Sequence, residues 1–443
     1  MTLEKPQTPT SNTVTDSEDE STCETPTGSS KDLSKDSSDA PDGGLRAWLV
    51  VFGAWCGMMP SMGLMTSMGV LQTWLSENQL KSYSNTDIGW IFGVFTFFIY
   101  FGSVQIGPVF DAHGLKYILV PGCVGLVLSL MMLSVAYEYY QFMLGFGVLG
   151  GISASVLATC SIASIAHWFN KRHGLAMAII ATASGFGGII FPMIFSNLIT
   201  TVGWGWAIRI IAFIVALFCA LCALCMRTRL PPQKGTALVD FTVFKELRYT
   251  VLSAAIVLSD SAFLIPITYI LPYALGQGMS ASLAYQLASI LNGASILGRF
   301  LCGFVADYIG RMNMLLANTF FCSFFTLALW LPAGSGGESR ETARIVAYVA
   351  LFGFWSGSTI SLPPVCIAQL CKAEEYGTRF GTTYSVVSVG TLVAIPVAGA
   401  IVSASGGGYE GVIWSCGMVY GLSFLLFLTA RGLSVGWRLK SVF

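Results

Sequence analysis

The sequence predicts an all-α membrane protein with twelve transmembrane helices in two six-helix bundles. Of its 443 residues, 54% are hydrophobic and only 10% are charged, too little charge to cover a soluble protein of this length. From Leu45 onward the chain is a series of apolar segments of about 20 residues or more, each long enough to cross a hydrocarbon core of roughly 30 Å. A polar turn also recurs at equivalent places in the two halves.

The apolar segments are continuous rather than alternating, and an open sheet edge cannot lie in lipid, so we expect helices rather than strands. The expected spans are 46–74, 88–107, 117–136, 140–165, 174–200, 205–226, 249–275, 283–305, 312–331, 343–369, 377–402 and 410–430. The longest polar gap between spans divides them six and six. The expected parts are a tail at 1–40, a first bundle at 41–226, a linker at 227–248, a second bundle at 249–430 and a C-terminal tail at 431–443.

Residues 1–40 have a different composition from the rest of the chain. Ser, Thr, Asp, Glu, Lys and Pro predominate, and such a segment buries too little apolar surface to fold by itself. It lacks the apolar core of a signal peptide. We expect a disordered cytosolic tail, with a phosphorylation or turnover signal around Ser17 to Ser21 as the alternative.

The bases predict the orientation, because cytosolic loops are enriched in Lys and Arg. One side of the predicted helices carries Lys116, Lys171, Arg172, Arg227, Arg229, Lys234, Lys245, Arg248, Arg311, Lys372 and Arg379. The other side carries Lys81, Arg209, Arg340 and Arg344. We therefore expect both termini in the cytosol and place the protein in the plasma membrane, although the sequence does not separate that membrane from a vacuolar one.

The recurring turn reads Gly-x-x-x-Asp-x-x-Gly followed by a base. An Asp at a helix end can face the positive N-terminus of a neighbouring helix, and the base can hold a carboxylate or a helix C-terminus. We expect a gating clasp that braces one access state, and a solvated loop is the alternative. The gating residues in the two copies are Asp111 and Lys116, and Asp307 and Arg311.

These turns resemble the loop motif of the major facilitator superfamily. Asp42-Gly43-Gly44 followed by Trp48 resembles the opening motif of its monocarboxylate porter family, and the segment 168–176 resembles that family's second signature. The segment 263–274 resembles the fungal monocarboxylate-transporter-like branch. The resemblance implies a secondary transporter with the major facilitator fold, which works by alternating access.

Arg299 is the sharpest candidate for substrate binding. A charge about two turns inside a membrane helix costs at least about 2.5 kcal/mol, so it should face a cavity and find an anionic partner. The resemblance implies that an arginine at this position binds a substrate carboxylate. The alternative is a structural arginine that snorkels or pairs with a helix end.

The chain also departs from the animal monocarboxylate porters. Those proteins have an acidic residue where this chain has Ser295, and a lysine in the first helix roughly where Thr66 lies. Lactate–proton symport by that route is therefore in doubt. Asp260 is a candidate replacement as the proton-coupling residue, because a buried carboxyl binds a proton more readily. The alternative places Asp260 at a helix N-terminus.

Further polar and aromatic residues inside the spans are candidates for the cavity wall. The substrate-binding set that we expect beside Arg299 is Asn292, Ser295, Tyr269, Tyr273 and Trp355, with Ser356, Ser358 and Thr359 as further wall residues. We expect no cofactor and no metal site. Cys219, Cys222 and Cys225 have no His or acid nearby in the sequence.

We expect a secondary active transporter, and not an enzyme, that moves a small organic anion, a monocarboxylate or related carboxylated metabolite, by proton-coupled symport. Its expected partners are that anion, protons and the lipid bilayer; the sequence leaves the oligomeric state open and is compatible with a monomer. Zero net charge argues against a nucleic-acid partner. One alternative is an efflux pump for a fungal secondary metabolite, and the second is a non-transporting nutrient sensor on the same fold.

Overall fold

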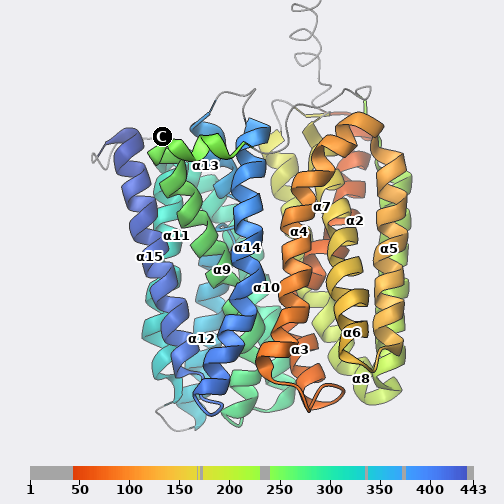
Figure 1. Cartoon of the computed structure of the whole chain (residues 1–443), viewed down its shortest axis with the longest axis vertical. Helices are drawn as coiled ribbons and strands as arrows, with labels where there is room; N and C mark the ends of the chain where they lie inside the picture. The colour runs from red at the N-terminus through yellow and green to blue at the C-terminus, as the bar shows by residue number, and fades with distance from the viewer. Residues whose placement is uncertain are drawn as a thin grey trace, which may run out of the picture. The chain divides into compact units, whose positions relative to one another are not determined.

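Long α-helices that run side by side make up the described structure (Figure 1). The computed structural model describes residues 43–166, 168–169, 173–229, 240–334, 338–371 and 376–436. The expected N-terminal tail therefore lies outside the described residues. The longer helices are α2 (Leu45–Thr66), α4 (Asn85–His113), α5 (Leu115–Val135), α7 (Gly151–Ala166), α8 (His173–Cys225), α9 (Leu247–Gly276), α10 (Ala281–Ile309), α11 (Arg311–Phe325), α12 (Glu338–Ser356), α14 (Tyr376–Ala404) and α15 (Glu410–Val435).

Short elements extend or connect the long helices. They are α3 (Met68–Glu77), α6 (Tyr139–Phe142), the π-helical η2 (Met143–Gly150) and η4 (Thr326–Trp330), the 3₁₀ turns η3 (Phe241–Lys245) and η5 (Leu331–Gly334), and α13 (Pro363–Gln369). The described residues contain no strand, and the prediction of an all-helical chain is confirmed for them.

Ten helical segments in the described ranges are long and apolar enough to cross a membrane. The expected count of twelve differs for two reasons. α8 contains the expected fifth and sixth spans, and it consists of two helices joined at Gly203, where φ is 77°. α12 carries charged residues in its first turns, among them Glu341 and Arg344, so composition alone does not mark it as a span.

The two copies of the repeated turn have the same backbone geometry. α4 ends at Gly114 with φ 81° and ψ 165°, and α10 ends at Gly310 with φ 93° and ψ 138°. Residues other than glycine avoid this region, so each final glycine of the motif is required by the turn itself. We call the end of the helices at Gly114 and Gly310 the turn face, and the end at Glu77 and Asn85 the opposite face.

In the described ranges, the most extensive contacts between the part of the chain before residue 240 and the part after it are made by three helix pairs. α4 packs along α14, α8 along α10, and α3 against α9, and Figure 1 shows α4 and α14 side by side. Glycines permit the close approach: a Cβ on Gly89 would lie 3.1 Å from the Cα of Pro396. Small residues at such contacts are typical of helix packing in membranes.

The expected first span, residues 46–74, is broken in its second half. α2 ends at Thr66 and α3 begins at Met68, with Ser67 between them at φ −99° and ψ 2°. The hydroxyl of Ser67 donates to the carbonyl of Gly63 at 2.7 Å, and its backbone N–H bonds Leu64 and Met65 instead. The side chain thus competes with the regular helical hydrogen bond. Helices broken in this way often contribute to transporter binding sites.

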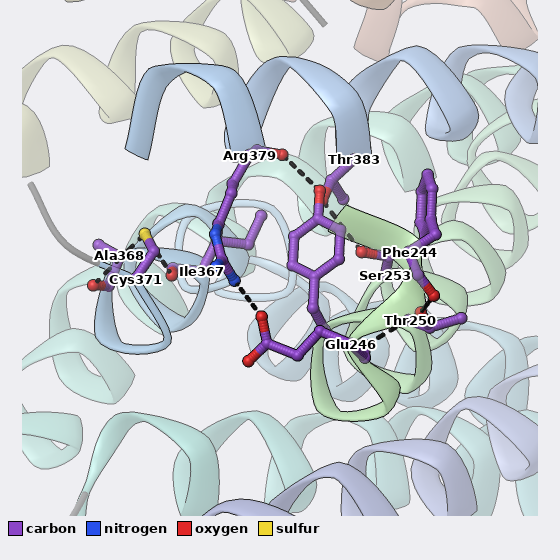
Figure 2. A network of polar contacts seen from close by, with 10 residues as sticks. Phe244, Glu246, Thr250, Ser253, Ile367, Ala368, Cys371, Arg379 and Thr383 are labelled. Carbon is purple, nitrogen blue, oxygen red and sulfur yellow. Dashed lines mark hydrogen bonds and ion pairs between the residues drawn. The ribbon is translucent and has the colours of Figure 1, made fainter. Parts of the chain in front are cut away.

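A network of polar contacts fixes α14 to the start of α9 at the turn face (Figure 2). Arg379 of α14 forms an ion pair with Glu246 at 2.7 Å. The hydroxyl of Tyr249 donates to the carbonyl of Arg379 at 2.6 Å and accepts from Thr383 at 2.8 Å. The last residues of the expected linker are therefore attached to α14.

Candidate functional site

Arg299 belongs to α10, and its side chain reaches α8. It lies deeper in its helix than the sequence suggested. α10 continues to Ile309, so Arg299 is nearly three turns, or about 15 Å, from the helix end. Its Nε donates to the carbonyl of Gly357 at 3.2 Å. One terminal nitrogen donates to the carbonyl of Ala181 and to the hydroxyl of Ser184, both on α8. The side chain thus joins helices from the two halves of the chain.

The hydrogen-bond acceptors around Arg299 are neutral. Within the described residues no carboxylate forms an ion pair with it. The bond to Gly357, directly after α12, is the contact that the structural alternative expects. The bonds to α8 are not contacts with a helix end, because Ala181 and Ser184 lie inside a helix that belongs to the other half. A positive charge surrounded only by neutral dipoles remains able to bind an anion.

Ser184 connects Arg299 to the broken first span. Its hydroxyl accepts from Arg299 and donates to the carbonyl of Ala181 at 3.1 Å. Its own carbonyl accepts from the hydroxyl of Thr66 at 3.2 Å, directly before the break at Ser67. Arg299, Ser184 and Thr66 therefore form one chain of polar contacts across α10, α8 and α2.

Asn292 and Ser295 lie on α10 near Arg299, and both are buried. The amide of Asn292 donates to the carbonyl of Gly188 at 3.2 Å and to that of Ala288 at 2.8 Å. A Cβ on Gly188 would collide with this amide, so a glycine is needed there. A Cβ on Gly357 would meet the hydroxyl of Ser295 at 3.0 Å. These contacts pack α8 and the end of α12 tightly on α10.

Asp260 lies near the middle of α9, which is continuous from Leu247 to Gly276. The alternative that placed it at a helix N-terminus is therefore wrong. Its side chain is buried, and neither carboxylate oxygen has a hydrogen-bond partner among the described residues. Tyr100 of α4 and Tyr420 of α15 interact with it electrostatically. Tyr100 belongs to the first half of the chain, so this carboxyl also faces the contact between the halves.

The aromatic residues of the expected substrate-binding set do not join Arg299. Tyr269 donates its hydroxyl proton to the carbonyl of Ile395 at 3.0 Å. Tyr273 packs edge-on against Trp330, with ring centroids 5.8 Å apart. Trp355 stacks on Phe321 with centroids 4.2 Å apart. Their ligand-binding roles remain predictions.

The structure describes only two of the four predicted gating side chains. The side chains of Asp111 and Asp307 lie outside the described part of the structure. Lys116 is exposed and Arg311 is half-buried at the turn face. The clasp itself remains a prediction, although the glycines that end both motifs have the backbone geometry given above.

A cavity of about 350 Å³ opens at the opposite face. Its walls come from α3 and α4 on one side and from α9 and the start of α15 on the other. The lining residues are Gln72, Thr73, Ser76, Glu77, Asn85, Tyr269, Pro272, Leu275, Gly276 and Tyr409. Arg299 is not among them. Tyr269 is the only residue of the expected substrate-binding set that lines this cavity.

Sequence reasoning missed Ser184 and, apart from Tyr269, the lining of the cavity. Ser184 stands among small residues that are typical of helix contacts, so nothing in its neighbourhood marks it. Gln72 was detectable, since it is an amide inside an expected span, and Glu77 is an acid shortly after that span. Polar side chains inside transmembrane segments are functional candidates.

Membrane-length helices, a broken span and a polar site between two halves define a multi-pass membrane protein. The family model of the Major Facilitator Superfamily matches residues 48–349. The chain is 39% identical over 399 residues to "MFS-type transporter 1" of an Ophiocordyceps species, covering 89% of this chain and 87% of the relative. It is 34% identical to a "Fujikurins efflux protein" of Gibberella fujikuroi, with 91% and 86% covered. It is 31% identical to a riboflavin transporter of Saccharomyces cerevisiae, with 92% and 82% covered.

The chain belongs to the major facilitator superfamily. It is therefore an integral membrane transporter of a small molecule, with the fold of that family, and not an enzyme.

Proposed function

We propose that this transporter exports a small organic secondary metabolite that carries an anionic group. The observation that carries the proposal is Arg299, whose guanidinium lies between the two halves of the chain among neutral acceptors. Similarity to the Fujikurins efflux protein supports export and this class of cargo. Export of a secondary metabolite replaces transport of a monocarboxylate, whose direction the sequence left open, as the favoured function, while the anionic group rests on Arg299.

Alternating access in this proposal is a movement of residues 41–226 against residues 249–430. The most extensive contacts between these parts, within the described residues, are α4 with α14, α8 with α10 and α3 with α9. Near Arg299 the halves are joined by hydrogen bonds, and at the opposite face they are hollowed by the cavity. The state described is thus closed around Arg299 and open toward the opposite face. Binding of an anion would replace the α8 acceptors and loosen the contact.

The proposed energy source is a proton gradient, with Asp260 as the group that takes up and releases the proton. A buried carboxylate without hydrogen bonds is costly, so the protonated form is favoured inside the protein. Tyr100, from the other half, interacts electrostatically with this carboxyl. Relative movement of the halves would change its surroundings and hence its affinity for a proton.

The proposed orientation places the turn face and both termini in the cytosol, because the bases lie mostly on that side. The proposed location is the plasma membrane. In this orientation the cavity at the opposite face opens to the outside, and the gating turns with Asp111, Lys116, Asp307 and Arg311 lie inside. An exporter would release its cargo through that cavity.

Membrane vesicles of opposite orientation test the direction of transport. Inside-out and right-side-out vesicles would be supplied with a panel of carboxylated metabolites and their neutral amide analogues, with an imposed proton gradient. We expect uptake of carboxylated compounds into inside-out vesicles, and loss of that uptake when a protonophore is added. Uptake only into right-side-out vesicles would overturn export and favour import.

Import of a vitamin-like compound is the second candidate function. The similarity to a riboflavin transporter over 92% of this chain supports it. The same vesicle assay with riboflavin separates the two candidates, because an importer would accumulate riboflavin in right-side-out vesicles.

A further inference from the structure

The cavity at the opposite face has a chemical character of its own. It lies between the halves and reaches inward from exposed Glu77 to buried Gln72 and Tyr269. Its volume of about 350 Å³ is within the range of small-molecule sites. The polar contacts of Arg299 are all made with Ala181, Ser184 and Gly357, none of which lines this cavity.

The inner end of the cavity holds an unused hydrogen-bond acceptor. The hydroxyl of Tyr269 gives its one proton to the carbonyl of Ile395 at 3.0 Å. Gln72 lines the cavity together with Tyr269, and only its amide nitrogen could donate to a hydroxyl whose one proton is already used. The amide oxygen of Gln72 then remains, and it has no partner within the described residues. Gln72 is 4% exposed and its amide oxygen is buried, so leaving this oxygen unpaired is costly, and a ligand reaches it only when the amide turns toward the cavity.

The outer part of the cavity is negatively charged. Glu77 supplies a carboxylate, and no Lys or Arg is among the lining residues. The hydroxyls of Thr73 and Ser76 already donate to helix carbonyls, each at 2.8 Å, so both are left as acceptors. Asn85 adds an uncharged amide that can donate as well as accept. A ligand that complements this lining needs hydrogen-bond donors and must not carry a negative charge there.

We propose that this cavity is a second ligand site, which binds a hydroxyl-rich or amine-bearing group of a small organic molecule. Gln72 and Glu77 accept hydrogen bonds from that group, one at the inner end and one at the rim. The site is opposite in charge to Arg299. Under the proposed export, an anionic group that leaves Arg299 meets a like charge here, and this favours its release. The site itself depends on neither the direction of transport nor the role of Arg299.

Thiol labelling measures the charge preference of the site directly. Ser76→Cys would place a thiol in the lining, and Thr201→Cys would place one on the exposed end of an α8 helix, outside the lining. The full-length protein in nanodiscs would react with 2-(trimethylammonium)ethyl methanethiosulfonate, a cation, and with 2-sulfonatoethyl methanethiosulfonate, an anion. The wild-type protein gives the background from native cysteines.

We expect Ser76→Cys to favour the cationic reagent over the anionic one by roughly threefold or more, relative to Thr201→Cys. Adding Glu77→Gln should remove most of this preference. The proposal would be overturned if Ser76→Cys with Glu77 present reacted equally fast with the cationic and the anionic reagent, relative to Thr201→Cys. An unreactive thiol at position 76 would also overturn it.

Protection by two matched compounds tests binding itself. Tyramine and 4-hydroxyphenylacetate share a phenol ring and differ in the sign of their charge. The uncharged reagent methyl methanethiosulfonate would label Ser76→Cys with each compound present at millimolar concentration. We expect tyramine to slow labelling by roughly twofold or more, and Glu77→Gln or Gln72→Leu to weaken this protection. No protection by tyramine, or equal protection by the anion, would contradict a donor-binding site.

Discussion

Arg299 on α10 donates a hydrogen bond to the hydroxyl of Ser184 on α8, so one guanidinium joins the two halves of the chain. An anion that binds Arg299 must compete with this hydroxyl and with the carbonyl of Ala181. Binding of cargo and separation of α8 from α10 are therefore linked, because the same donor groups serve both.

Ser184→Ala should loosen the contact between the halves and tighten binding of an anion. The variant removes a hydrogen bond to a charged group, which contributes about 1.5–3 kcal/mol, so the apparent Tm should fall. The Ser184 hydroxyl no longer competes with the cargo for the guanidinium of Arg299, so the KM for the cargo should fall in a vesicle assay.

Ser129→Ala is the matched control for that variant. Ser129 is buried, and its hydroxyl has no hydrogen-bond partner within the described ranges. The Ser129→Ala substitution should leave Tm and KM near the wild-type values. Equal effects of the two substitutions would show that the Ser184 contact has no special role.

Asp260→Asn should separate transport from the proton gradient. Asparagine has nearly the same shape but carries no titratable proton. We expect the transport rate to lose its dependence on an imposed pH difference, while binding of cargo persists. Tyr100 and Tyr420, the titratable groups that interact with Asp260, remain in place in this variant.

Asp240→Asn is the control for Asp260→Asn. Asp240 lies outside the membrane segments, and Thr242, through its hydroxyl and backbone N–H, lowers the pKa of Asp240 below its ordinary value. This carboxylate therefore stays ionised at neutral pH, and its replacement should leave proton coupling unchanged. Wild-type proton dependence in Asp260→Asn would remove Asp260 from the coupling mechanism.

The last glycine of each repeated turn should tolerate substitution far less than the first. Gly114 and Gly310 have φ of 81° and 93°, so Gly114→Ala or Gly310→Ala should cost about 1–3 kcal/mol in strain. Gly107 and Gly303 open the same motifs inside helices, and a Cβ there would meet nothing within 4 Å. Alanine at Gly107 or Gly303 should be neutral or stabilising by up to about 1 kcal/mol.

Thermal denaturation of the four alanine variants in one detergent compares these costs. A similar loss of Tm for alanine at the first and at the last glycines would contradict this prediction. Backbone conformation would then not explain why both turns end in glycine.

Much of the helical scaffold follows from the length and composition of the apolar segments. The same rules did not locate the break at Ser67, because it depends on one side chain that competes for the carbonyl of Gly63. They also placed the end of α10 too early. The polar residues Asp307 and Arg311 mark a loop by composition, whereas the helix ends where Gly310 adopts a positive φ.

The candidate site was predictable where a charge stands inside an apolar segment. Arg299 and Asp260 were found for that reason. Ser184 was not, because hydroxyls are common in helix contacts and its role depends on which helix lies opposite. Tyr273 and Trp355 were expected beside the cargo, and this stays a prediction; the structure places their rings against Trp330 and Phe321. Periodicity shows that an aromatic residue is inside a bundle, but not which neighbour it meets.

The most direct test of the central claim is untargeted mass spectrometry of cells and medium from a metabolite-producing fungus that lacks its own copy of this transporter. The cells would express wild-type protein, Arg299→Ala, or the control Arg209→Ala, which removes a half-buried arginine held by Ser134 and Trp206 away from the site. We expect the compounds exported by wild type and by Arg209→Ala to be organic anions, and their export by Arg299→Ala, at equal expression, to fall by about 30-fold or more. Wild-type export by Arg299→Ala, or cargo without an anionic group, would contradict the account.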